Sequence, residues 1–175
     1  RIDDIEWIRL HYAYPTAFPD DVIDVMASEP KICKYLDIPF QHISDRMLTA
    51  MKRRHTKADA LALIERLRER IPDIALRTTL LVGYPTETEQ DMQELEQFVR
   101  DVRFDRLGVF AYSEEEGTYS ARELRDDVPE EEKQRRVDRI MRLQEGISLE
   151  NNLARVGRTM RVIVDSRQGD YYVAR

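Results

Sequence analysis

Residues 74–82 read IALRTTLLV, an almost unbroken run of apolar and β-forming side chains. Such a run is typical of a strand that is buried on both faces of a parallel sheet. Gly83, Tyr84 and Pro85 follow directly and should end the strand, because glycine and proline interrupt regular structure. The stretch therefore predicts a central parallel strand that ends in a tight turn.

A capped helix is predicted on each side of this strand. Thr56 and Asp59 stand in the capping-box relation ahead of apolar residues at helical spacing, namely Leu63, Ile64, Leu67 and Ile71. Thr88 and Asp91 repeat the relation ahead of a second stripe, namely Met92, Leu95, Phe98, Val99 and Val102. Because a capping box satisfies two backbone N–H groups, both helices should begin at a defined residue.

Further strands and helices extend the alternation in both directions. Residues 5–13, 35–40 and 107–112 are rich in β-branched and aromatic side chains and read as strands. A helical pattern covers residues 20–28, and Ser44 should cap a short helix. Strands that alternate with helices predict a parallel α/β sheet with right-handed crossovers. The pattern does not distinguish a doubly wound sheet from a barrel-like one.

The character of the chain changes near its C-terminal end. Residues 129–156 have the spacing of one long charged helix. Residues 161–165 and 171–174 then read as two strands joined by a turn. We therefore expect an α/β unit with a long helix over residues 1–155, and the start of a separate β module over residues 156–175.

Composition and charge narrow the possible functions. The formal net charge is −6 and the pI is about 5.2, whereas a broad nucleic-acid footprint normally needs a basic face. No apolar run approaches the roughly 18 residues of a membrane span. With 42% apolar and 35% charged residues, the sequence suits a soluble cytosolic protein. The single cysteine, Cys33, excludes a cysteine-only metal site, and His42 has no further ligand at metal-binding spacing.

Polar residues gather where the predicted strands end. In parallel α/β folds, ligands bind at the carboxyl ends of the strands, where the loops converge. These ends supply Tyr12, Tyr14, Gln41, His42, Ser44, Thr78, Thr79, Gly83, Glu87, Tyr112 and Ser113. The set is mostly neutral and suits a hydroxyl-bearing ligand such as a ribose. The same residues also fit ordinary turns, caps and strand positions, so both interpretations stay open.

Three segments resemble radical-SAM methylthiotransferases, in the order and at the spacing of that family. Residues 35–44, YLDIPFQHIS, with MKRRHT after them at 51–56, are similar to the region of the fourth barrel strand. Residues 77–88, RTTLLVGYPTET, resemble the fifth strand. Residues 104–118, FDRLGVFAYSEEEGT, resemble the sixth strand and the loop beyond it. The hairpin after Val156 resembles the start of the TRAM β-barrel that follows.

This resemblance implies the fold, the cofactors and the chemistry. The fold would be a partial parallel radical-SAM barrel, followed by an incomplete TRAM-like β module. Such enzymes bind S-adenosylmethionine and two four-iron four-sulfur clusters, of which one generates a 5′-deoxyadenosyl radical and the other provides sulfur. Clusters are held by cysteine thiolates, and Cys33 alone cannot supply them. We therefore expect an inactive C-terminal fragment of such an enzyme, with no catalytic or metal-binding residue of its own.

The resemblance also assigns residues to S-adenosylmethionine. Gln41 and Ser44 would lie near its ribose or methionine part. Arg77 would face the site from the fifth strand and pair with the methionyl carboxylate. Tyr112, or the backbone beside it, would lie at the edge of the adenine.

A G-x-I-x-G-like run is expected against the adenine. Leu81 and Gly83 match this run, and Thr79 replaces its first glycine. Thr86 stands where the family has a glycine, which makes the turn less flexible and leaves the role of Glu87 less defined.

The target of the reaction is predicted from one loop. Residues 113–118, SEEEGT, resemble the RimO branch of the family, whose target is an aspartate of the small-subunit ribosomal protein S-twelve. The low pI agrees with a basic protein partner rather than with tRNA. Two alternatives stay open: the MiaB branch, which modifies a tRNA adenosine, and a non-catalytic α/β binding module.

Truncation of a barrel predicts a physical property as well. It should leave two open sheet edges and an apolar face that further strands would cover. We therefore expect self-association or marginal stability.

Overall fold

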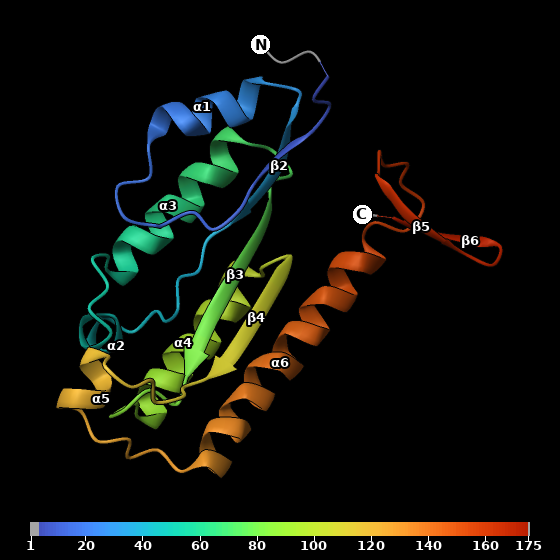
Figure 1. Cartoon of the computed structure of the whole chain (residues 1–175). Coiled ribbons are helices and arrows are strands. Elements are labelled where there is room, and N and C mark those ends of the chain that lie inside the picture. Colours follow the sequence, from blue (N-terminus) through green and yellow to red (C-terminus); the bar gives the residue numbers. More distant parts are fainter. Residues whose placement is uncertain (1–3, 175) are drawn as a thin grey trace.

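The computed structural model describes residues 4–174, and a parallel sheet lies at its centre (Figure 1). The four strands lie side by side in chain order, namely β1 (Ile8–Leu10), β2 (Ile32–Asp37), β3 (Ala75–Val82) and β4 (Arg106–Ala111). The connecting helices are α1 (Asp20–Ser28), α2 (Asp45–Ala50), α3 (Lys57–Arg70), α4 (Glu89–Val102), α5 (Tyr119–Glu123) and α6 (Glu130–Leu153). The predicted parallel α/β fold is therefore confirmed.

The strand order settles how the sheet is wound. Parallel strands in chain order, joined by right-handed crossovers, place every connecting helix on the same face of the sheet. A doubly wound sheet would instead need a point at which the strand order reverses. The arrangement is thus that of a barrel wall, with a helix-covered outer face and an open inner face.

Burial along β3 follows from this arrangement. Leu76, Leu80 and Val82 point into the core, whereas Arg77 and Thr79 on the inner face are only half-buried. The expectation of a strand buried on both faces was therefore wrong, because no helix among residues 4–174 covers the inner face.

The core lies between the sheet and its helices. Three phenylalanines pack edge to face at its centre, with Phe98 5.9 Å from Phe40 and 5.4 Å from Phe104, measured between ring centroids. The predicted apolar stripes of α3 and α4 are buried against these rings. Both capping boxes are also present, at Thr56 with Asp59 and at Thr88 with Asp91.

Strand boundaries differ from the prediction by a few residues. β2 begins at Ile32 and ends at Asp37, three residues before the predicted bounds at each end. Pairing stops ahead of Pro39 because proline has no N–H to donate, and it resumes as one bridge between Gln41 and Leu80. The first strand is shorter than the predicted 5–13.

The C-terminal part consists of the predicted long helix and a hairpin. α6 is followed by β5 (Val164–Gln168) and β6 (Tyr171–Ala174), which pair antiparallel. The first hairpin strand begins three residues after the predicted position, and every residue of both strands is exposed. A TRAM-like module beginning at residue 156 remains a prediction. None of the helices within residues 4–174 is long and apolar enough to cross a membrane.

The inner face is not the apolar surface that truncation predicted. We define it by the side chains of Arg9, Tyr35, Asp37, Arg77, Thr79, Leu81, Arg106 and Phe110, which register and strand alternation place on one side. Charged and polar groups occupy the part nearer the amino ends of the strands, which we call the lower part. Apolar side chains occupy only the end near the carboxyl termini of the strands. The two open edges, β1 and β4, are as expected.

Candidate functional site

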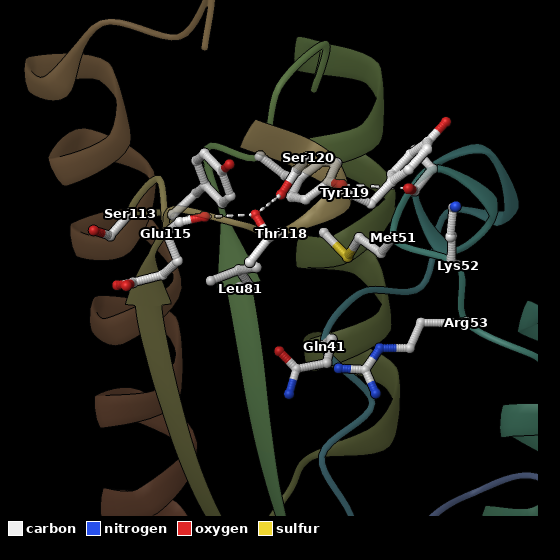
Figure 2. A pocket seen from close by; sticks show the side chains of 13 residues that line it. Gln41, Met51, Lys52, Arg53, Leu81, Ser113, Glu115, Thr118, Tyr119 and Ser120 are labelled. Atoms are coloured by element: carbon white, nitrogen blue, oxygen red, sulfur yellow. Dashed lines mark hydrogen bonds between the residues drawn. The ribbon is translucent and has the colours of Figure 1, made fainter. Parts of the chain in front are cut away.

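A cavity of about 360 Å³ opens at the carboxyl ends of β3 and β4 (Figure 2). Its walls come from the segment after β2, the end of α2, and the loop and short helix after β4. Gln41, Leu81, Tyr112 and Ser113, all singled out from the sequence, line it. The cavity therefore lies at the sheet edge where parallel α/β folds bind ligands.

The backbone fixes Gln41 at the mouth of this cavity. Its φ of +69° is left-handed, and its N–H donates to the Thr79 carbonyl at 2.9 Å. The Leu81 N–H in turn donates to the Gln41 carbonyl at 2.7 Å. The carboxamide makes no hydrogen bond within residues 4–174, so it is available to a ligand.

Tyr112 presents a buried polar atom at the cavity. Its ring packs edge to face on Tyr84 at 5.1 Å, and the ammonium of Lys133 lies 5.3 Å from the ring centroid. The hydroxyl is buried and has no hydrogen-bond partner among the described residues. Because an unpaired buried hydroxyl is unfavourable, this atom is suited to a polar ligand or a water.

Ser44 behaves differently from its prediction. It stands at the start of α2 but makes no side-chain cap; its hydroxyl donates instead to Asp91 Oδ1 at 2.7 Å. Asp91 also accepts from Thr88 and pairs with Arg46. Burial alone would raise the pKa of Asp91, but hydrogen bonds from Arg46, Thr88 and Ser44 hold it well below its usual range. Ser44 therefore ties α2 to the start of α4 and does not line the cavity.

A buried carboxylate holds the turn after β3. Glu87 Oε2 accepts from the Gly83 N–H at 2.7 Å and from Arg136 Nη1 of α6 at 2.5 Å. The other oxygen, Oε1, lies 3.2 Å from His42 Nε2. One side chain thus joins the ends of β2 and β3 to α6, directly behind the cavity.

The tautomer of His42 follows from its surroundings. Its Nδ1 accepts from the N–H groups of Ile43 at 2.9 Å and Ser44 at 3.0 Å, so Nδ1 carries no proton. Its Nε2 lies 3.2 Å from Glu87 Oε1, and neither of these two buried atoms makes a hydrogen bond within residues 4–174. The contact is therefore a close approach of two buried polar atoms that form no hydrogen bond with each other.

Gly83 occupies a confined position in the same turn. Its φ is +74°, and a Cβ at this position would lie 2.4 Å from Cγ of Lys133. The Lys133 ammonium is held by Asp126 at 2.5 Å. A glycine is therefore required, both for its backbone conformation and because α6 packs directly on the turn.

Besides Ser44, three predicted cofactor residues lie outside the cavity lining, namely Arg77, Thr79 and Gly83. Thr79 is half-buried on the inner face, two residues below Leu81. Arg77 lies two residues lower and pairs with Asp37 at 2.7 Å. A pairing of Arg77 with a methionyl carboxylate would have to compete with this ion pair.

Several lining residues were not assigned from the sequence. Met51, Lys52 and Arg53 come from the end of α2, and Tyr119 comes from α5. The first three belong to the MKRRHT segment, which was noticed only as a resemblance. The Lys52 ammonium lies 3.2 Å from the centroid of the Tyr119 ring and connects the two walls. No periodic pattern marks a helix as short as α5.

The two expected kinds of cofactor fit these residues differently. A cavity with apolar walls, a free carboxamide and an unpaired hydroxyl suits the adenosine part of S-adenosylmethionine. No group of three metal-ligating side chains occurs within residues 4–174, and Cys33 is the sole cysteine. These residues therefore do not fit an iron–sulfur cluster.

Comparison with known proteins agrees with this geometry. The profile of the Radical SAM superfamily matches residues 1–99. The chain is 55% identical over 174 residues to proteins named ribosomal protein uS12 methylthiotransferase RimO from Bacteroides thetaiotaomicron and Parabacteroides distasonis, and 53% identical to that of Bacteroides fragilis. Each match covers 99% of this chain but 40% of the relative. The chain thus spans about two fifths of their length.

Solved structures show the same fold. Coproporphyrinogen III oxidase (HemN) from Escherichia coli superposes with a TM-score of 0.60 over 83% of this chain and 32% of that one, at 22% identity. The radical S-adenosylmethionine methyltransferase TsrM from Kitasatospora setae superposes with a TM-score of 0.50 over 59% of this chain and 20% of that one, at 22% identity.

Proposed function

The chain belongs to the radical SAM superfamily, and from that premise we propose that it forms the cofactor-binding wall of a methylthiotransferase acting on ribosomal protein uS12. The observation that carries the proposal is identity of 53–55% across nearly the whole chain with relatives of that name. Because the chain spans 40% of those relatives, the activity is proposed for the complete protein. Residues 1–155 would belong to the barrel, and residues 156–175 would begin a TRAM-like module.

In the proposed site, S-adenosylmethionine supplies the hydrogen-abstracting chemistry. Leu81 and the Gly83 backbone would contact its adenine, and the Tyr112 hydroxyl would donate to or accept from its edge. The Gln41 carboxamide would hydrogen-bond the ribose. Glu87, through Gly83, would keep the turn in the conformation that the adenine needs. The two clusters of such enzymes would need ligands from outside these residues.

The acidic loop supports a basic protein target. Glu114, Glu115 and Glu116 are exposed beside the cavity mouth, and the chain has a net charge of −6. This acidic side of the mouth, which lies on another wall than Lys52 and Arg53, attracts a basic ribosomal protein and repels the phosphates of tRNA. We therefore place the target aspartate in a basic segment of uS12, and the enzyme in the cytoplasm with its target.

The proposal is tested with the complete reading frame that encodes this chain. The purified protein is reconstituted with iron and sulfide, and is then offered ribosomes or uS12 in one reaction and tRNA in another. We expect mass spectrometry to find the methylthio group on an aspartate of uS12 only. Transfer to tRNA alone would contradict the proposal and favour the tRNA-modifying alternative.

A further inference from the structure

The lower inner face carries a charged cluster that the cofactor cavity does not use. Tyr35 of β2 lies at its centre, with the Arg9 guanidinium 4.9 Å from its ring centroid and the His11 ring edge-on at 5.7 Å. Asp37, which is 3% exposed, is the carboxylate of the cluster and pairs with Arg77 at 2.7 Å.

Arg106 of β4 completes this cluster, and in the part of the chain that the structure describes it has no carboxylate partner. It is the register partner of Arg77, so both side chains extend from the inner face. Its guanidinium donates to the backbone carbonyl of Asp105 at 2.9 Å, and no carboxylate within residues 4–174 pairs with it. Among the described residues, Arg106 is therefore an exposed cation without a carboxylate partner.

The cluster as a whole has a surplus of positive charge. Three arginines lie near one carboxylate, and His11 Nε2 accepts from Arg9 at 2.8 Å while its Nδ1 lies 3.7 Å from Asp37. Burial, and then Asp37, raise the pKa of Tyr35 although the arginines oppose the change. The phenol therefore keeps its proton at neutral pH and remains a hydrogen-bond donor.

We propose that Arg106 and Tyr35 bind the side-chain carboxylate of the aspartate that the enzyme modifies. This inference rests on the proposed function and deepens it by naming the residues that recognise the target. A guanidinium presents a planar pair of donors that matches a carboxylate, and the phenol adds a third donor. Arg77 contributes positive charge but is already paired with Asp37.

The position of the cluster fits a target rather than the cofactor. The row formed by Arg77 and Arg106 lies four residues below the row formed by Leu81 and Phe110, about 13 Å along the strands. Gly108 lies between the rows, where a Cβ would come within 3.9 Å of Arg77 Nη2 and 3.8 Å of the Phe110 ring. The absence of a side chain there leaves room between the cluster and the cavity.

The chemistry of aspartate makes a carboxylate anchor effective. In its side chain, the only carbon that carries hydrogen is bonded directly to the carboxylate carbon. When the cluster holds the carboxylate from the lower part of the inner face, that hydrogen-bearing carbon points towards the cavity. The carboxylate is then fixed one bond away from the carbon that reacts. An asparagine has the same shape but cannot accept the charged pair of hydrogen bonds.

The test combines a change in the enzyme with a change in the target. The complete, reconstituted protein is given a peptide copy of the uS12 segment that contains the aspartate, or the same peptide with asparagine there. We expect Arg106→Gln to raise KM for the aspartate peptide about 10- to 100-fold, as the loss of a charged hydrogen bond does. The preference for aspartate over asparagine should largely disappear, and Arg106→Lys should restore part of it.

Arg100 of α4 provides the matched control. It is an exposed arginine on the helix-covered side, paired with Glu96 at 3.5 Å, and Arg100→Gln should change neither KM nor the preference. An Arg106→Gln variant that keeps the preference for aspartate would overturn the proposal. A rise in KM for S-adenosylmethionine instead would assign the cluster to the cofactor and would also overturn it.

Binding measurements separate this proposal from the proposed function. If the unmodified enzyme transfers no methylthio group to uS12, the proposed function fails. The fluorescence anisotropy of the labelled aspartate and asparagine peptides still reports on the site. Equal affinity of the unmodified enzyme for the two peptides would then contradict the carboxylate site by itself.

Discussion

Gly83 is the residue at which the turn after β3 meets α6, and the need for a glycine there can be measured. We expect Gly83→Ala to lower the free energy of unfolding by at least about 2 kcal/mol, because a side chain is strained at φ +74° and would clash with Lys133. Urea unfolding measures the change. Lys133→Ala in the same chain should recover the part of the clash that is due to Cγ and Cδ of Lys133, whereas the contact with its Cβ at 3.0 Å and the backbone strain remain.

Gly146 is the matched control for this substitution. It lies within α6, and a Cβ there would meet nothing within 4 Å. Gly146→Ala should therefore raise the free energy of unfolding by about 1 kcal/mol, as expected for alanine in a helix. Equal losses at both glycines would contradict the role given to Gly83.

Residues of the site could be predicted only where local sequence determines their place. Leu81 lies near the end of β3, and Gln41 and Tyr112 follow neighbouring strands. Because these strand ends must converge, the structure brings the three residues to one cavity. The partners of Ser44 and Arg77 are set by tertiary contacts. Their carboxylates come from α4 and β2, some 47 and 40 residues away in the chain, and no local pattern reveals such pairs.

At the scale of elements, Asp91 makes the start of α4 sensitive to pH. The pKa of Asp91 is lower in the folded chain than in the unfolded chain, where it is about 3.9. Ionised Asp91 therefore stabilises the fold above that pH, and the stabilisation is lost as the pH falls towards the folded-state pKa. We expect Asp91→Asn to be destabilised at pH 7, with the difference from the unmodified chain narrowing below about pH 4.

Asp59 tests whether the capping box alone explains this effect. It holds the same position in the capping box of α3, but it is exposed and its partner is Thr56. Urea unfolding at several pH values should show a smaller loss for Asp59→Asn. A loss at Asp59 as large as that at Asp91 would contradict a contribution from Arg46 and Ser44.

Helices were predicted more accurately than strands, for a physical reason. A capping box acts locally, so α3 and α4 begin where the sequence indicates. Strand ends depend on which neighbour offers hydrogen bonds, and β2 stops where Pro39 prevents pairing with β3. α5 is too short to produce a period and went unnoticed.

For the whole molecule, the winding of the sheet was the property that the sequence could not determine. Strand order depends on contacts between distant segments, whereas hydrophobic periodicity reports only on the immediate neighbours of a residue. Once the order is known, the single helix-covered face follows, and so does the open inner face. That face is charged in its lower part, which also weakens the case for apolar self-association, although the edges of β1 and β4 remain open.

The hairpin of β5 and β6 should be the least stable part of the molecule. All its residues are exposed, and a hairpin of two strands is at best marginally stable alone. The preceding segment, in contrast, contacts the residues just before β1 and β4, through Arg161 with Trp7 and through Arg155 with Asp105 at 2.5 Å. We expect hydrogen exchange to find fast amides in the hairpin and protected amides in β3. Deleting residues 164–175 should change the free energy of unfolding by less than about 0.5 kcal/mol, because exposed positions seldom contribute more; a larger loss would show that the hairpin packs on the α/β unit.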